Sequence, residues 1–343
     1  MNKRIVLSVF LFSSVSFLCA VSCSGTPDKV TVGEGVIADA LQLVPDTVGY
    51  EPDGAESYVY VIADSMMHVF NNADGVQCRY FHEIFRMRDM SRAGENLPFG
   101  PDDSSYLYVM PMVTGNEYLA YDPVKKRVIE PDGHVYDVDY VTMGLVPYLG
   151  RALLLNPYYF KDSEGHTNKQ PRIAVTDTAY RWGIPEVRYL SVNTTRGTLV
   201  ANAGKERVMF FDANSSLMEF YSGDLSCPAG MTVGPDIDTV GYTMAPSGDK
   251  YETVYLSETP KSYYVTAAGD ASQVVAVYRH AGDSNADYLF RFDWNGKLSD
   301  VYRLTCRVKS ISISASETGV NVYVWKEKGE GDDKIGLLCY TLR

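Results

Sequence analysis

The stretch Arg291-Phe292-Asp293-Trp294-Asn295-Gly296 decides the fold class of this 343-residue chain. It joins an aromatic run to an Asp and then to a Gly, which is the pattern of a β-strand that ends in a turn and folds back. The same plan recurs at Val69-Phe70-Asn71, at Ala120-Tyr121-Asp122 and at Phe210-Phe211-Asp212. The chain therefore contains a repeat of short strands.

The acidic residue in each copy has a structural explanation. An Asp side chain at the end of a strand accepts hydrogen bonds from backbone N–H groups of the turn that follows. We therefore expect turn-forming rather than catalytic roles for the four carboxylates at these positions, which are Asp74, Asp122, Asp212 and Asp293.

The aromatic anchors of the repeat are unevenly spaced along the chain, at Phe70, Tyr121, Phe211, Phe292 and Tyr340. If each of the two large gaps hides a degenerate copy, the period is about 40 to 50 residues, which is the range of four-stranded propeller blades. The segments 159–165 and 244–249 are the candidate hidden copies. The sequence thus predicts an all-β fold, a single β-propeller with four-stranded antiparallel blades. Six blades are expected, and seven are the alternative.

One segment competes with this reading. Residues 80–90 place several apolar side chains at helical spacing. Because Gly and Pro follow closely, we predict instead a strand that enters a long loop.

The first 35 residues predict export and lipid attachment. Lys3 and Arg4 precede an apolar run that is too short and too rich in serine to span a membrane, which is typical of a secretory signal peptide. The following Ala20-Val21-Ser22-Cys23 resembles the lipobox of bacterial lipoproteins, in which the Cys is lipidated. An ordinary signal peptide, with Cys23 a spare thiol, is the alternative. The predicted organisation is a signal peptide at 1–22, a tether at 23–35 and a propeller domain at 36–343.

Charge limits the partners that this chain can bind. It has 31 Lys and Arg residues against 43 Asp and Glu residues, a formal net charge of −12. An acidic protein repels phosphate backbones and anionic lipids, so nucleic-acid binding is not expected and membrane contact is expected through the lipid on Cys23. The residue after Cys23 is Ser24 and not an Asp. By resemblance to the sorting of enterobacterial lipoproteins, the lack of an Asp at this second place favours the outer membrane. Both orientations, toward the periplasm and toward the cell surface, stay open.

Two segments near the C-terminus carry a family resemblance. Residues 267–278 and then 288–298, which contain Phe292-Asp293-Trp294-Asn295-Gly296, resemble the TolB-like six-bladed propeller lipoproteins of Gram-negative bacteria. In that family an aliphatic strand precedes such a turn, and a final strand like Val301-Tyr302-Arg303-Leu304 follows. The specific match covers roughly residues 263–323. The resemblance implies a fold and an envelope location but no chemistry, since most members have no established activity.

Motifs of the common enzyme classes are absent from the sequence, including G-x-S-x-G, H-E-x-x-H, the P-loop and G-x-G-x-x-G. Asp283-Ser284-Asn285-Ala286-Asp287 alternates oxygen ligands like the start of a calcium loop. However, Tyr288 and Trp294 replace the Gly and Glu that an EF-hand needs. A solvated hairpin loop is expected there, with a looser calcium site as the alternative.

The candidate ligand-binding residues are Tyr180, Arg181 and Trp182, which lie in a loop-like stretch. Aromatic rings beside a cation suit the recognition of a sugar or a peptide. A Trp packed beneath a loop is the alternative. Tyr158-Tyr159 and Tyr263-Tyr264 are further candidates of the same kind.

The cysteines other than Cys23 show no C-x-x-C or zinc spacing. Buried single thiols are the preferred explanation. Cys306 and Cys339 are the pair to test for a disulfide, because both lie in what are predicted to be strands of one sheet.

These features predict an envelope-anchored lipoprotein whose propeller binds or scaffolds a glycan, peptide or protein without catalysis. The enzyme alternative is a calcium-dependent lactonase or hydrolase with a metal ion in the central funnel. No cofactor is expected apart from calcium in that alternative.

Overall fold

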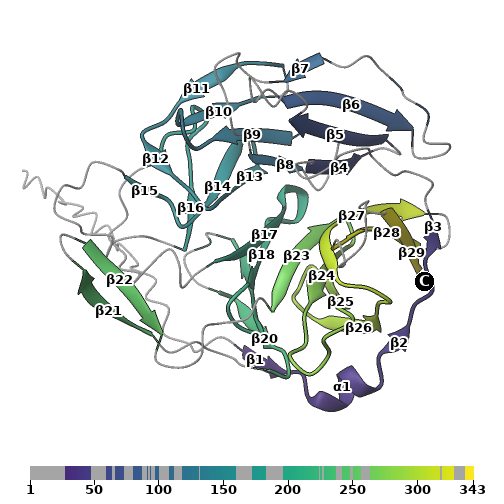
Figure 1. Ribbon diagram of the computed structural model, residues 1–343. Helices are drawn as coiled ribbons and strands as arrows, with labels where there is room; N and C mark the ends of the chain where they lie inside the picture. Colours follow the sequence, from purple (N-terminus) through teal and green to yellow (C-terminus); the bar gives the residue numbers. More distant parts are fainter. Residues whose placement is uncertain are drawn as a thin grey trace, which may run out of the picture.

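The computed structural model (Figure 1) is built almost entirely of β-strands, which confirms the predicted all-β class. Helical structure in the described part is limited to α1 (Glu34–Ala38) and a 3₁₀ turn, η2 (Ala203–Lys205). No helix among these residues is both long and apolar enough to cross a membrane. The structure describes residues 28–47, 59–63, 66–72, 80–86, 91, 93, 97–99, 108–111, 118–130, 132–159, 172–182, 196–223, 225, 228–236, 242–247, 250–255, 263–316, 319–327 and 337–343.

Six sheets of three or more strands follow one another along the described chain, each built from neighbouring antiparallel strands. The first three contain β4 (Val59–Ala63), β5 (Met66–Asn72), β6 (Tyr80–Arg86) and β7 (Leu97–Phe99); then β8 (Tyr108–Pro111), β9 (Tyr118–Asp122), β10 (Arg127–Ile129) and β11 (Val135–Asp137); then β13 (Gly144–Tyr148), β14 (Arg151–Leu155) and β16 (Ile173–Val175). The last three contain β17 (Gly197–Asn202), β18 (Arg207–Asp212), β19 (Leu217–Ser222) and β20 (Gly230–Val233); then β23 (Tyr264–Gly269), β24 (Gln273–Tyr278), β25 (Tyr288–Asp293) and β26 (Leu298–Arg303); then β27 (Val308–Ser316), β28 (Gly319–Lys326) and β29 (Leu337–Leu342).

The first strand of each sheet contacts the first strand of the next, in the order β4, β8, β13, β17, β23 and β27, and β27 also contacts β4. Figure 1 shows the six sheets spread around the middle of the molecule. Each sheet therefore has one neighbour before it and one after it, so both of its faces can be buried.

The apolar core is divided between successive sheets, as β14 illustrates. Ala152 and Leu154 pack with residues of β9 and β10, whereas Leu153 and Leu155 pack with residues of β17 and β18. Strands β18 and β24 alternate in the same way between their two neighbours. Because successive side chains of a strand point to opposite faces, a strand buried on both faces reads as a continuous apolar run.

An N-terminal strap, residues 28–47, runs along the outer edges of the last three sheets (Figure 1). Its strand β1 (Asp28–Thr31) pairs in parallel with β20, and β2 (Leu41–Gln42) pairs in parallel with β26. Strand β3 (Asp46–Thr47) pairs antiparallel with β29 and becomes the fourth strand of the last sheet.

The strap differs from the tether expected over residues 23–35, because that range includes β1 and the start of α1. All four side chains of β1 are exposed. The strand is held by backbone pairing at a sheet edge, which side-chain composition does not reveal. The predicted signal peptide and Cys23 lie outside the described residues.

The predicted turn roles are confirmed for Asp122, Asp212 and Asp293. In each case Oδ1 accepts a hydrogen bond from the backbone N–H two residues later, at 2.9, 2.8 and 2.9 Å respectively. Asp74 lies outside the described residues. The predicted strand at the start of 80–90 is also confirmed, since β6 ends at Arg86.

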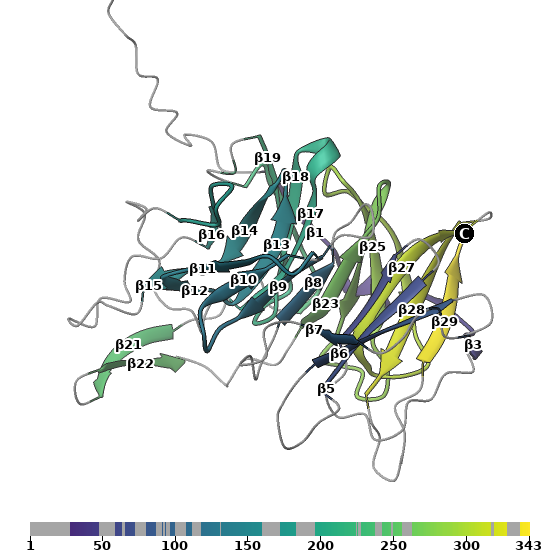
Figure 2. The same cartoon turned by 90° about the horizontal axis from the view of Figure 1, so that it is seen from above.

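Of the two candidate hidden copies of the repeat, 159–165 and 244–249, the structure describes only residue 159 and residues 244–247. Tyr158–Tyr159 forms β15, which pairs with β12 (Tyr140–Val141) in a two-stranded sheet. Residues 244–247 belong to a hairpin of β21 (Tyr242–Ser247) and β22 (Lys250–Tyr255), which stands apart from the six sheets in Figures 1 and 2. The anchors themselves change place, because Phe211 lies in the second strand of its sheet and Phe292 in the third.

Candidate functional site

The β10–β11 hairpin presents the first part of the candidate site at its tip. The backbone N–H of Glu130 donates to His134 O at 2.9 Å, and that of Gly133 donates to Glu130 O at 2.9 Å. The backbone N–H of His134 also donates to Asp132 Oδ1 at 2.9 Å. Gly133 has φ of 86°, a conformation that a residue without Cβ adopts readily. The turn therefore holds Glu130 and His134 opposite each other.

The loop after β16 supplies the second part. Asp177 Oδ1 accepts hydrogen bonds from the backbone N–H groups of Ala179 at 2.9 Å and Arg181 at 2.8 Å. Between them Tyr180 has φ of 55°, which is uncommon for a residue that is not glycine. Such a conformation costs roughly 1 to 3 kcal/mol and persists only where surrounding contacts fix it.

Each polar group of Tyr180 forms a hydrogen bond that helps to fix this conformation. Its N–H donates to Asp177 O at 3.1 Å, and its carbonyl oxygen accepts from the Tyr140 hydroxyl at 3.0 Å. Its own hydroxyl donates to Glu130 Oε1 at 2.6 Å, across 50 positions of sequence. The loop and the hairpin are thereby joined at one carboxylate.

Three rings gather around that carboxylate, and we name this group, Glu130, His134, Tyr136 and Tyr180, the rim cluster. The Tyr136 hydroxyl donates to Glu130 Oε2 at 3.4 Å. The Tyr136 ring lies 4.9 Å from the Tyr180 ring, edge to face, and 4.6 Å from the His134 ring. Burial raises the pKa of both tyrosine hydroxyls, and Glu130 raises each pKa further, so both remain protonated donors at neutral pH.

The structure separates the three sequence candidates of this loop. Tyr180 and Trp182 are only 4% and 7% exposed and belong to the apolar cluster between the second and third sheets. The Trp182 ring packs edge to face on Tyr140 at 6.1 Å. Arg181 is exposed between them. Trp182 therefore follows the alternative of a Trp packed beneath a loop. Of the aromatic residues nearby, His134 is exposed and Tyr136 is half-buried against the same apolar cluster.

The further aromatic candidates have different positions. Tyr263 and Tyr264 are both buried in the cluster between the fourth and fifth sheets. The side chains of Tyr158 and Tyr159 lie outside the described part.

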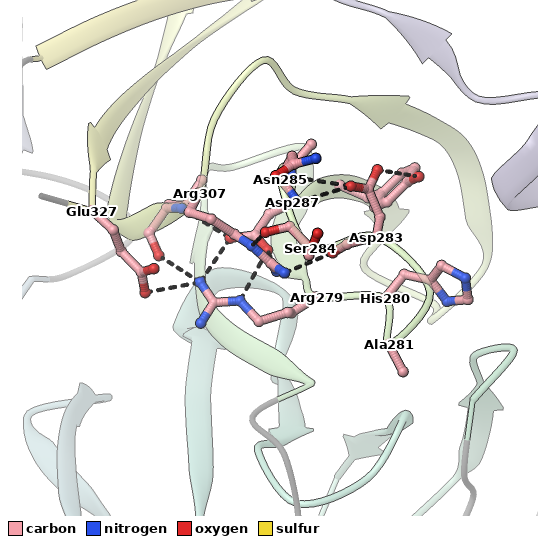
Figure 3. A network of polar contacts seen from close by, with 12 residues as sticks. Arg279, His280, Ala281, Asp283, Ser284, Asn285, Asp287, Arg307 and Glu327 are labelled. Carbon is pink, nitrogen blue, oxygen red and sulfur yellow. Dashed lines mark hydrogen bonds and ion pairs between the residues drawn. The ribbon is translucent and has the colours of Figure 1, made fainter. Parts of the chain in front are cut away.

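The loop 283–287, considered above as a loose calcium site, is the centre of an ion-pair network (Figure 3). Asp287 is fully buried. Arg279 donates to both of its oxygens, at 3.0 and 2.9 Å, and Arg307 donates to Oδ1 at 2.6 Å. The backbone N–H of Val308 completes the set at 2.8 Å. Each Asp287 oxygen thus has two donors, which leaves the carboxylate committed to protein groups.

The neighbouring Asp283 is committed in the same way. Its oxygens accept from the backbone N–H of Asn285 at 3.0 Å, from the Tyr288 hydroxyl at 3.2 Å and from Arg303 at 2.9 Å. Burial opposes ionisation of Asp283, but these hydrogen bonds and the Arg303 charge outweigh it and lower its pKa. Across the part of the chain that the structure describes, no group of three or more His, Cys, Asp or Glu side chains is placed to hold a metal ion.

A smaller polar group joins the strap to the fourth and fifth sheets. His280 Nδ1 lies 3.1 Å from Asp236 Oδ2, and His280 Nε2 lies 3.7 Å from a carboxylate oxygen of Glu34 in α1. Asp236 also accepts from the Tyr278 hydroxyl and from the backbone N–H of Ala281. This group fixes α1 to the loops that it crosses.

Cys306 and Cys339, the cysteines that the structure describes, form no disulfide. Burial raises the pKa of the Cys306 thiol, which lies 3.9 Å from the Tyr340 hydroxyl. Both side chains are partly buried, in line with the single-thiol prediction. Cys78 and Cys227 lie outside the described residues.

Comparisons with known proteins show the fold. No family model matches the chain, and no curated protein matches it either. A member of the DUF4221 family from Bacteroides vulgatus has a TM-score of 0.53 at 10% identity, covering 89% of this chain and 99% of that one. A "putative exported protein" from Bacteroides fragilis has a TM-score of 0.54 at 11% identity, covering 92% and 99%.

Structural neighbours of the chain are β-propeller proteins. One is a β-propeller domain from Myceliophteria thermophila, with a TM-score of 0.41 and 9% identity, covering 87% of this chain and 100% of that domain. At these identities the likenesses concern architecture alone. The TolB-like resemblance therefore stays a prediction.

Proposed function

We propose that this protein is an outer-membrane lipoprotein in which a closed six-bladed propeller binds a partner without catalysing a reaction. The cyclic contacts of the first strands, from β4 to β27 and back to β4, support a ring of six blades. The pairing of β3 with β29 supports closure, because an N-terminal strand then completes the last blade. The lipobox at Ala20-Val21-Ser22-Cys23 supports the anchor.

The rim cluster is the observation that carries the binding function. Loops at the ends of strands can vary without disturbing a packed core, and binding residues concentrate on them. Here the loop after β16 and the β10–β11 hairpin meet at Glu130. The strained Tyr180 of the loop holds the Glu130 carboxylate and packs against the Tyr136 ring. The carboxylates of the 283–287 loop instead bind groups of the fifth sheet and, through Asp287, Arg307 and Val308 at the start of the sixth.

The anchor is tested by membrane fractionation of the full chain and its Cys23→Ala variant, with Cys306→Ala as a matched thiol control. We expect release from membranes for Cys23→Ala alone. Membrane retention of that variant would contradict the lipoprotein assignment.

Binding is tested in cells with a photo-crosslinking residue at position 134, in the exposed part of the rim cluster. The control carries the same residue at Val124, which is also exposed but lies outside the cluster. We expect adducts from position 134 and none from position 124. Equal labelling from both positions, or no adduct from position 134, would count against a binding role for this rim.

A further inference from the structure

We propose that the rim cluster binds a neutral saccharide, with the Tyr136 and His134 rings as the platform and Glu130 as the acceptor of sugar hydroxyls. This inference rests on the proposed binding function and names its ligand class. The cluster joins three side chains of the β10–β11 hairpin to Tyr180, which the fold brings to Glu130 across 50 positions of sequence.

The platform is held in place before any ligand arrives. Tyr136 is fixed by its edge contact with Tyr180, by the adjacent His134 ring and by its hydroxyl contact with Glu130. Aromatic faces carry partial negative charge, so they attract the partly positive C–H groups on one side of a pyranose ring. A ring that is already fixed loses little conformational freedom on binding, which favours affinity.

The acceptor lies next to the platform. Each oxygen of Glu130 accepts one hydrogen bond from a tyrosine hydroxyl, at 2.6 Å to Oε1 and 3.4 Å to Oε2. An ionised carboxylate has about four acceptor positions, so two remain for donors from a ligand. Hydrogen bonds to a charged acceptor are about twice as strong as neutral ones, and adjacent sugar hydroxyls can reach both oxygens at once.

The surrounding charge selects among sugars. Asp132, Asp137 and Asp177 lie on the same hairpin and loop and are exposed. Arg127 lies 3.4 Å from Asp137 and offsets one of them, and Arg181 is an exposed cation next to Tyr180. The remaining field is negative and repels uronic or phosphorylated sugars, so a neutral sugar is the ligand that fits.

A saccharide suits this geometry better than a peptide side chain does. In the rim cluster His134 is exposed and Glu130 and Tyr136 are half-buried, whereas the apolar side chains beneath it are already packed against Trp182 and Tyr140. An apolar peptide anchor needs a desolvated pocket at the centre of its interface. A sugar ring can instead place one apolar face on an aromatic ring while its hydroxyls bond to nearby polar groups.

The test is a printed glycan array of neutral and acidic glycans, probed with the purified full chain, followed by titration calorimetry with the strongest neutral glycan. We expect that His134→Ala and Glu130→Gln each weaken binding about tenfold or more, as truncation of a central contact generally does. Tyr136→Ala should abolish binding, and Tyr136→Phe should keep most of it because the ring remains. Val124→Ala is the surface control and should bind like the unmodified chain.

Different failures have different meanings. If no array glycan binds, or if bound glycan is insensitive to His134→Ala and Glu130→Gln, the saccharide site is wrong. If the cell crosslinks from position 134 carry a protein instead, the binding function survives and the saccharide inference does not. Because His134 is exposed, its variant tests the site even where Tyr136→Ala fails to fold.

Discussion

The Asp287 network makes the sharpest stability prediction. Asp287→Asn removes the charge that two arginines share and places an amide N–H₂ where one of them donates. Breaking one side of a buried ion pair costs about 3 to 5 kcal/mol, because the partner charges lose a buried counterion. Glu327, 2.9 Å from Arg279, still offsets one of the two arginine charges. Asp287 itself is fully buried and its four hydrogen bonds are 2.6 to 3.0 Å long, so we expect a loss within that range.

The assay is thermal unfolding of the purified chain followed by circular dichroism. A domain of this size loses about 2 °C of midpoint per kcal/mol, so Asp287→Asn should unfold about 6 to 10 °C lower. The matched control is Asp300→Asn, whose carboxylate is 43% exposed and pairs with Arg291 at 3.4 Å. An exposed pair contributes about 0 to 1 kcal/mol, hence a shift within about 2 °C. Equal shifts for the two variants would refute the conclusion that the Asp287 ion pairs stabilise the contact between the fifth and sixth sheets.

Three further predictions also concern the stability of the fold. Gly296→Ala should destabilise the fold more than Gly133→Ala, although both glycines have positive φ. A Cβ at position 296 would lie 2.5 Å from a ring carbon of Phe220, whereas one at position 133 meets nothing within 4 Å. Similar losses of stability for the two variants would contradict this packing. Burial raises the pKa of Asp212 to about 6. Between pH ~4 and ~6 the folded chain therefore holds a proton that the unfolded chain releases, and stability should fall as the pH rises. Asp212→Asn should flatten this dependence of the unfolding free energy on pH, which urea unfolding at several pH values would detect. An unchanged dependence would exclude the Asp212 carboxyl as its source. Val32→Ala should lower the free energy of unfolding by about 1 to 2 kcal/mol and Val30→Ala should leave it almost unchanged, since the two side chains are 4% and 58% exposed. Equal effects would mean that the strap does not pack against the sheets.

The strands and turns could be predicted because their causes are local. Asp293 and Gly296 form a turn with atoms only a few residues away, and the run 274–278 is apolar because β24 has a sheet on each side. The spacing of aromatic anchors did not locate the sheets, because a constant spacing requires every anchor to lie in the same strand of its sheet. Phe211 and Phe292 occupy the second and third strands of their sheets, and the hairpin β21–β22 lies between them in the chain.

The candidate site was only half visible in sequence. The stretch Tyr180-Arg181-Trp182 is in the correct neighbourhood, yet Trp182 packs inward. The more accessible rings, His134 and Tyr136, come from a hairpin about 45 positions earlier. A usable signal was present in Asp132-Gly133, a turn pair that sets Glu130 opposite His134. The contact between Glu130 and Tyr180 has no local signature, because it depends on how the second and third sheets pack.

The course of the strap determines how mechanical load would travel through the molecule. A pull applied at the N-terminal end of the strap reaches β1 first, then α1 with its Glu34–His280 contact, then β2. Strand β3, which completes the last sheet, is the final element in this series. The attachments nearer the N-terminus must therefore yield before force reaches the β3–β29 pair, so the last sheet would be the last of the three to feel such a pull.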